Sequence, residues 1–97
     1  MPTYIQLTHW TQQGIQTVKE APARLDAAKQ AAKAMGGEIK AAYMVMGRYD
    51  LVVIFEAPDD ESVAKGTLAL GMQGNLRTET LKAFTEDEYR KIIASLP

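Results

Sequence analysis

The residues that could do chemistry gather at two places in this 97-residue chain. His9 and Trp10 end an alternating segment near the N-terminus, and the polar stretch Gly47–Asp50 separates two apolar runs. His9 is the single histidine, so one chain cannot build a metal site from several histidines. It could still serve as a general base or as an axial haem ligand. More often, a histidine at a strand end lies near solvent and has no chemical role.

The stretch Gly47-Arg48-Tyr49-Asp50 has two interpretations. Tyr49 and Asp50 could line the mouth of a pocket in which Arg48 pairs with a carboxylate or phosphate of a ligand. Alternatively, Gly47 takes a positive φ and Asp50 accepts hydrogen bonds from loop amides, so that the turn sets the register of a hairpin. The spacing matches no catalytic signature, and the structural interpretation is therefore favoured.

Tyr43, Met44 and Met46 precede that stretch. Alternation places the two methionines on one face of a strand and Tyr43 on the other. Beside Trp10, the methionines could form an adaptable apolar wall of a pocket, although such a pair more often belongs to a core or a dimer interface. The predicted ligand-binding residues are His9, Trp10, Tyr43, Met46, Arg48, Tyr49 and Asp50.

Composition excludes several classes of function. The chain has no cysteine, which removes disulfides, thiolate metal sites and a cysteine nucleophile. A net charge of −1 without a long basic stretch argues against nucleic-acid binding. No apolar run could span a bilayer and the N-terminus does not read as a signal peptide, so we expect a cytoplasmic protein. The acidic residues Asp59–Glu61 fit a helix N-terminus better than a metal site, and the sequence identifies no cofactor.

A hairpin over Tyr43–Phe55 organises the predicted elements. The pattern predicts four strands, at 3–10, 38–46, 50–56 and 76–84, with the polar turn between the second and third. It also predicts a short turn after Thr11, helices from Ala23 and from the Asp59-Asp60 cap, and a last short helix after a capping box at Thr85. Pro22 either interrupts a helix that begins at Thr11 or lies in the first turn of a new one.

This order, β-α-β-β-α-β with a terminal helix, is the ferredoxin-like split βαβ arrangement. We therefore expect an α+β fold with a four-stranded antiparallel sheet and both long helices on one face. Alanines form the inner stripe of the first long helix, which should let it lie close to the sheet.

The third strand indicates how the other face of the sheet is covered. It is apolar at five successive positions, Leu51 to Phe55. A strand that is apolar on both faces is normally covered on both. Since a short chain leaves much apolar area to be buried by association, we expect a homodimer that pairs sheet to sheet, or a larger ring of such dimers.

The chain resembles the GYD-domain family, named for a Gly-Tyr-Asp motif that Gly47, Tyr49 and Asp50 carry here, with Arg48 after the glycine. Segments at 2–8, 34–43, 46–60 and 74–88 match as well, so the resemblance covers nearly the whole chain. It implies a single domain over residues 1–97 and a likeness to the dimeric α+β barrels, in which two ferredoxin-like sheets pack face to face. It implies no established biochemical function.

Three functions stay open at this stage. The first is a small homo-oligomeric module that binds an apolar or acidic small molecule between sheet and helices. The second is an enzyme of the α+β barrel kind, a cofactor-free or haem-dependent isomerase or oxygenase with His9 or Asp50 as the base. The third is a purely structural assembly unit.

Overall fold

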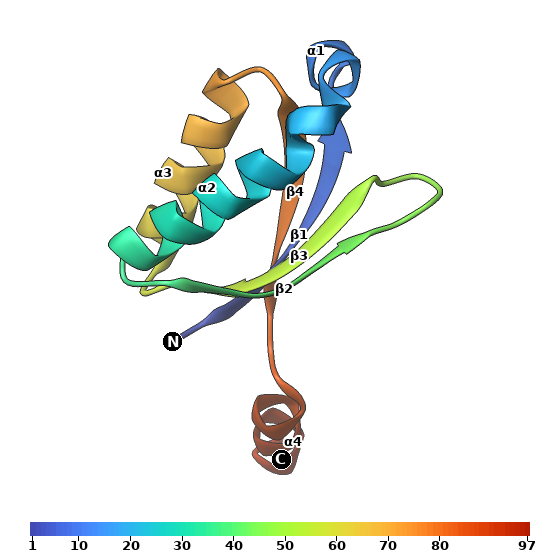
Figure 1. The fold of residues 1–97 in the computed structure, drawn as a ribbon. Helices are drawn as coiled ribbons and strands as arrows, with labels where there is room; N and C mark the ends of the chain where they lie inside the picture. The colour runs from blue at the N-terminus through green and yellow to red at the C-terminus, as the bar shows by residue number, and fades with distance from the viewer.

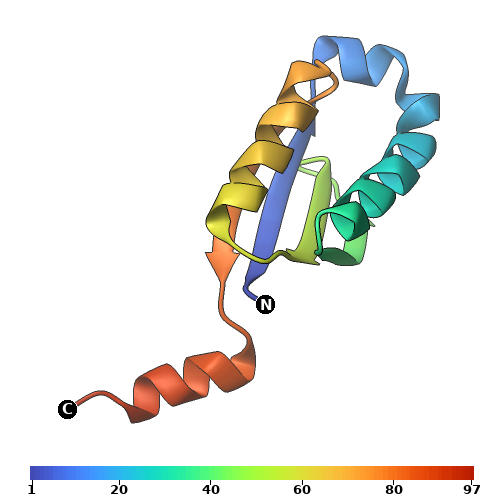
Figure 2. The ribbon, with the colours of Figure 1, turned by 90° about the vertical axis from the view of Figure 1, so that its left-hand side faces the viewer.

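A computed structural model describes all 97 residues as one four-stranded sheet with helices on one side. The order of the elements is β1 (Thr3–Trp10), α1 (Gln12–Gln16), the 3₁₀ turn η1 (Val18–Glu20), α2 (Ala21–Ala34), β2 (Glu38–Met44), β3 (Leu51–Glu56), α3 (Asp60–Met72), β4 (Leu76–Ala83) and α4 (Glu86–Ala94). Figures 1 and 2 show α2 and α3 on the same side of the sheet. The strands lie in the order β2-β3-β1-β4 and every neighbouring pair is antiparallel. The predicted ferredoxin-like fold is confirmed.

The central strand β1 divides its side chains between two different environments. Tyr4, Gln6 and Thr8 are buried, and the Tyr4 hydroxyl donates a hydrogen bond to Asp60 at the start of α3. This alternate set therefore lies under the helices, and the Tyr4 ring stacks on Phe55 with 5.4 Å between ring centroids. Ile5 and Leu7 point to the opposite face, which we call the open face because no helix covers it.

Local sequence signals set the ends of the helices. Thr11 caps α1 by accepting a hydrogen bond from the Gly14 amide, and Asp59 caps α3 by accepting one from Ser62. The Ser62 amide also holds the pKa of the Asp59 carboxyl below its usual value. The capping box predicted at Thr85 and Glu88 is present, with both of its hydrogen bonds. Pro22 lies in the first turn of α2, which decides between the two interpretations of that proline.

The connection between β2 and β3 is longer than the predicted turn. The strand predicted to reach Met46 ends at Met44, where it pairs with Leu51, the first residue of β3. Residues 45–50 form a loop that closes with a hydrogen bond of 2.8 Å from the Val45 amide to the Asp50 carbonyl. Gly47 has a φ of +130°, the positive value that the sequence predicted. In Figure 1 this end of the hairpin extends away from the side where α2 and α3 lie.

The last helix, α4, projects away from the rest of the molecule (Figures 1 and 2). All of its residues are exposed. The molecule is 52 Å long, and its radius of gyration of 14.6 Å exceeds the value of about 12.5 Å typical of a compact chain of this length. None of the helices combines the length and the apolar character that a membrane span requires.

The bond between Tyr4 and Asp60 makes stability depend on alkaline pH. The hydrogen bond to the Asp60 carboxylate, together with burial and the nearby negative charges, raises the pKa of Tyr4 to about 12. An unfolded tyrosine ionises near pH 10. The stability linked to this raised pKa is therefore complete below about pH 10 and is lost as the pH rises toward 12.

Titration of the tyrosinate absorbance should show a step near pH 12 that the Tyr4→Phe variant lacks. Tyr89→Phe, at an exposed position on α4, is the matched control and should leave that step in place. A Tyr4→Phe variant that keeps the step would contradict the assignment.

Candidate functional site

Asp50 joins the loop at residues 45–50 to the central strand. Its backbone amide donates to the Thr8 carbonyl at 2.9 Å, which continues the pairing of β3 with β1 by one residue. Its carboxylate accepts a hydrogen bond of 2.9 Å from the Trp10 amide. Both bonds fix the end of β1 against the start of β3, so the geometry gives Asp50 a structural role and its carboxylate is already engaged.

Tyr49 turns back over the open face of the sheet. Its ring lies 4.9 Å from the ring of His9, centroid to centroid, and its hydroxyl donates to the Glu79 carboxylate at 3.0 Å. His9, Tyr49 and Glu79 come from β1, the loop and β4, and they form a polar group at the edge of an apolar surface. We call it the His9–Tyr49–Glu79 cluster.

Strand alternation places Arg77 and Glu79 on the same face of β4, where a cross-strand ion pair would be the expected interaction. In the structure Glu79 instead accepts a hydrogen bond from Tyr49 and makes no salt bridge. The Arg77 guanidinium lies beside Gly71 of α3, around the edge of the sheet. Strand alternation alone could not predict that the loop would bring the Tyr49 hydroxyl to Glu79.

The other predicted site residues are scattered. Tyr43 lies opposite Val52 at the edge of the open face and is 59% exposed. Met46 and Arg48 are exposed in the loop, Met46 at 94%, so Met46 does not form a pocket wall with Trp10. Of the seven predicted residues, the structure brings only His9 and Tyr49 into contact through their side chains, and Asp50 holds the backbone beneath them.

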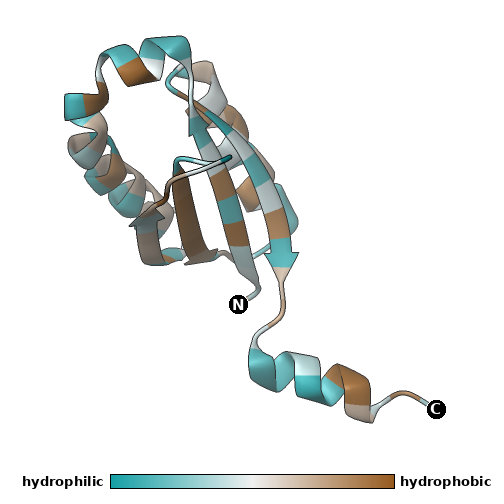
Figure 3. Cartoon of the chain, turned by 90° about the vertical axis from the view of Figure 1, so that its right-hand side faces the viewer, coloured by the Kyte–Doolittle hydropathy of each residue, from teal (hydrophilic) through white to brown (hydrophobic).

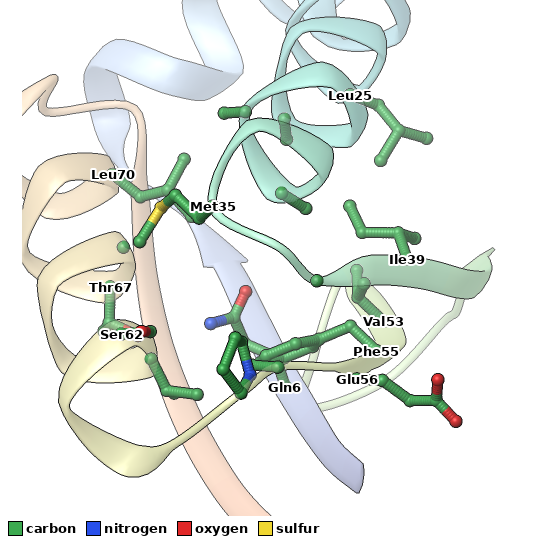
Figure 4. A pocket seen from close by; sticks show the side chains of 18 residues that line it. Gln6, Leu25, Met35, Ile39, Val53, Phe55, Glu56, Ser62, Thr67 and Leu70 are labelled. Carbon is green, nitrogen blue, oxygen red and sulfur yellow. The ribbon is translucent and has the colours of Figure 1, made fainter. Parts of the chain in front are cut away.

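A separate cavity of about 160 Å³ lies between the sheet and the two long helices (Figure 4). Its wall comes from β1, β2, β3, α2, α3 and the adjoining loops, and it includes Gln6, Leu25, Ala28, Ala32, Met35, Ile39, Val53, Phe55, Val63, Gly66 and Leu70. None of the seven residues predicted to bind a ligand lines it. A cavity thus exists at the predicted location between sheet and helices, and the seven residues predicted to bind a ligand lie outside its wall.

Two signals in the sequence could have identified this wall. Gln6 alternates with Ile5 and Leu7, so it had to lie on the opposite side from the apolar pair. The alanine stripe of α2 is the second signal, because side chains as short as Ala28 and Ala32 leave space above the sheet, and both line this cavity. No three His, Asp or Glu side chains come together in an arrangement that could hold a metal ion.

Comparison with known proteins supports the resemblance seen in the sequence. A family model described as GYD domain matches residues 4–93. The chain belongs to the GYD domain family. The resemblance assigns the family's motif to Gly47, Tyr49 and Asp50. In this structure Gly47 lies in the loop at residues 45–50, the Tyr49 ring lies over the open face, and Asp50 bonds to β1.

Two relatives of this GYD-domain chain come from Thermus thermophilus. The protein described as "Glutamine synthetase and cystathionine beta-lyase binding protein" is 37% identical over 84 residues, which cover 86% of this chain and 88% of that protein. The crystal structure of TTHA0845 from the same organism has a TM-score of 0.51 and 26% sequence identity, and the match covers 88% of this chain and 95% of that one. Both matches extend over most of the GYD domain.

Replacing Asp50 should test its structural role in the motif. We expect Asp50→Ala to lower the free energy of unfolding by about 2 kcal/mol, because it removes a charged acceptor from the Trp10 amide. Asp50→Asn keeps a neutral acceptor and should cost less. The measurement is urea unfolding, with Asp26→Ala at an exposed position of α2 as the control, expected to change stability by less than about 0.5 kcal/mol. Equal effects of Asp50→Ala and Asp26→Ala would contradict this role.

Proposed function

We propose that this GYD-domain protein is a homo-oligomeric interaction module that pairs with a second copy through the open face of its sheet. The observation that supports it most strongly is the composition of that face. One central row is apolar across three strands, since Ile5 lies between Ile54 and Leu81. In the next row Leu7 lies between Val52 and the Glu79 of the His9–Tyr49–Glu79 cluster. Leu81 is 50% exposed and the other aliphatic residues are only half-buried.

Figure 3 shows the molecule from the side opposite to Figure 2, with β3 apolar along its length. Within one chain, nothing but the Tyr49 loop approaches this surface. Monomeric proteins seldom leave a contiguous apolar patch of this kind exposed to water. The face is also self-complementary in principle, because a two-fold axis would bring the same rows of side chains together from both copies.

The helix α4 offers a second surface for the same partner. Its apolar residues Tyr89, Ile92 and Ile93, and Leu96 just after its end, are each more than 40% exposed. A helix of nine residues is marginal on its own in water, so its apolar side needs a surface to pack on. The sheet is four strands wide at about 4.8 Å per strand, and five residues of each strand at about 3.4 Å per residue set its length. The open face therefore has an area of about 330 Å². A stable interface buries about 800 Å² per partner, so contacts from α4 would supply part of the difference.

A protein partner beyond the second copy is suggested by the relative from Thermus thermophilus, which is named for binding two enzymes. We extend this to the present chain as a proposal: the paired form binds a metabolic enzyme, which also agrees with the cytoplasmic location predicted from the sequence. The outer surfaces of the helices stay free for such a partner when the open faces are paired.

A second candidate function is the binding of a small molecule between sheet and helices, as the sequence predicted. The cavity of about 160 Å³ favours it. No comparable observation favours an enzyme, since the Asp50 carboxylate binds the Trp10 amide and His9 lies against Tyr49 on the open face.

Ile54→Lys tests the proposed pairing most simply. Ile54 lies on the open face between Ile5 and Ala41, with no charged cross-strand neighbour, so a lysine can remain in water in the monomer. In a two-fold dimer the change occurs twice, and we expect self-association to weaken by at least about a hundredfold. Sedimentation equilibrium measures the effect.

The matched control is Ala27→Lys, on the exposed outer side of α2, which should leave association unchanged. Circular dichroism should show the same secondary structure in both variants. Association that survives Ile54→Lys, in a folded protein, would contradict pairing through the open face.

A further inference from the structure

The cavity under α2 is lined mainly by apolar side chains and holds no other part of the chain. We propose that it is a binding site for an uncharged, largely apolar molecule about the size of one aromatic ring, with a single hydrogen-bonding group directed at Gln6. This inference rests on the second proposed function, small-molecule binding, and names the class of ligand. It does not depend on pairing through the open face.

The two ends of α2 are held by contacts that keep the cavity open. At its C-terminal end, Gly37 passes so close to β3 that an added Cβ would lie 2.5 Å from the Glu56 carbonyl oxygen. Near its N-terminal end, the Arg24 guanidinium donates to the Thr17 hydroxyl at 3.0 Å and to the Gly14 carbonyl at 3.3 Å. The helix is thus fixed on both sides of its middle turns.

Between these contacts, α2 presents side chains too short to reach the sheet. Ala28, Ala31 and Ala32 line the cavity from above, and Val53 and Phe55 line it from below. Gly66 of α3 lines it from the side, and a Cβ added there would meet no atom within 4 Å. The space therefore follows from short side chains along one side of α2 and from Gly66 of α3, while the two ends of α2 are held in place.

The size of the cavity indicates the size of its ligand. The cavity is partly open to solvent, and its volume of about 160 Å³ is close to that of engineered apolar cavities of about 150 Å³ that take up benzene. Met35, at 43% exposed, lies where the cavity meets solvent and could move to admit a ligand, since methionine is flexible.

The polar groups indicate its chemistry. Gln6 is 8% exposed, and its amide makes one long hydrogen bond of 3.4 Å to the Thr80 hydroxyl. In Figure 4 the Gln6 amide points in among the lining side chains. Glu56 is the single charged residue in the wall, and it pairs with Lys40 at 3.9 Å. The hydroxyl residues Ser62 and Thr67 also line the wall, but they are only half-buried, whereas Gln6 is buried. A charged ligand would lose its hydration without gaining a counter-charge, so an uncharged ligand with one polar group for Gln6 fits best.

Three small probes separate the classes of ligand: toluene is apolar, p-cresol adds one hydroxyl, and benzoate is anionic. Titrations of the full chain followed by amide NMR should show saturable shifts at cavity residues with toluene and p-cresol, and none with benzoate. Gln6→Leu should weaken p-cresol binding and leave toluene binding unchanged or stronger.

Filling the cavity provides the matched pair of variants. Ala28→Leu should weaken toluene binding by at least about tenfold and raise the melting temperature, because the new side chain occupies the space. Ala27→Leu, on the exposed side of the same helix, should leave toluene binding unchanged.

Saturable benzoate binding without toluene binding would overturn the inferred class of ligand and leave the small-molecule function standing. Absence of shifts with all three probes, while Ala28→Leu stabilises the protein, would mean a space that no ligand enters and would overturn both. Unfolding of Ala28→Leu, with Ala27→Leu stable, would show that the space is not free and would also overturn both.

Discussion

The sheet of this protein is apolar on both faces, while its own helices cover only one. Leu51 to Phe55 are apolar without a break, so β3 sends Val53 and Phe55 under the helices and Val52 and Ile54 to the open face. β1 makes the division sharper, because its apolar residues Ile5 and Leu7 lie on the open face and its polar Gln6 and Thr8 under the helices. The aliphatic residues of β1 therefore lie on the uncovered face, and the proposed pairing with a second copy would bury them.

This distribution of apolar and polar side chains also explains why the sheet and its helices pack loosely. Only six residues of the chain are buried, and two of these are Gln6 and Thr8. The Thr8 hydroxyl is buried without a hydrogen-bond partner, although a buried polar group usually has one. Alanines of α2 above, and Gln6 with Val53 and Phe55 of the sheet below, leave a cavity instead of a close-packed core. The helix layer is held at its ends, through Gly37 and Arg24, more than along its length.

The GYD motif links the loop between β2 and β3 to the open face of the sheet. Asp50 fixes the loop at residues 45–50 to the end of β1, and that bond places Tyr49 over the open face beside His9 and Glu79. If two copies pair through this face, the His9–Tyr49–Glu79 cluster lies at the rim of the interface, where polar groups set register and orientation.

Much of the fold was predictable from local signals. The alternation over Thr3–Trp10, the capping box at Thr85 and Glu88, and the order of elements each led to the structure that was found. The candidate site was less predictable, because it depends on distances between elements. Strand alternation cannot show that Tyr49 returns to Glu79 across 30 residues, nor that contacts at Gly37 and Arg24 fix the two ends of an alanine-rich helix.

Sedimentation equilibrium of the unmodified chain over a wide range of concentrations tests the central claim most directly, namely that a second copy covers the open face. The account predicts a dimer, or an even multiple of the chain mass if dimers assemble further. A single-chain mass at every concentration would contradict it, because the apolar row across β1, β3 and β4 would then face water in the native protein.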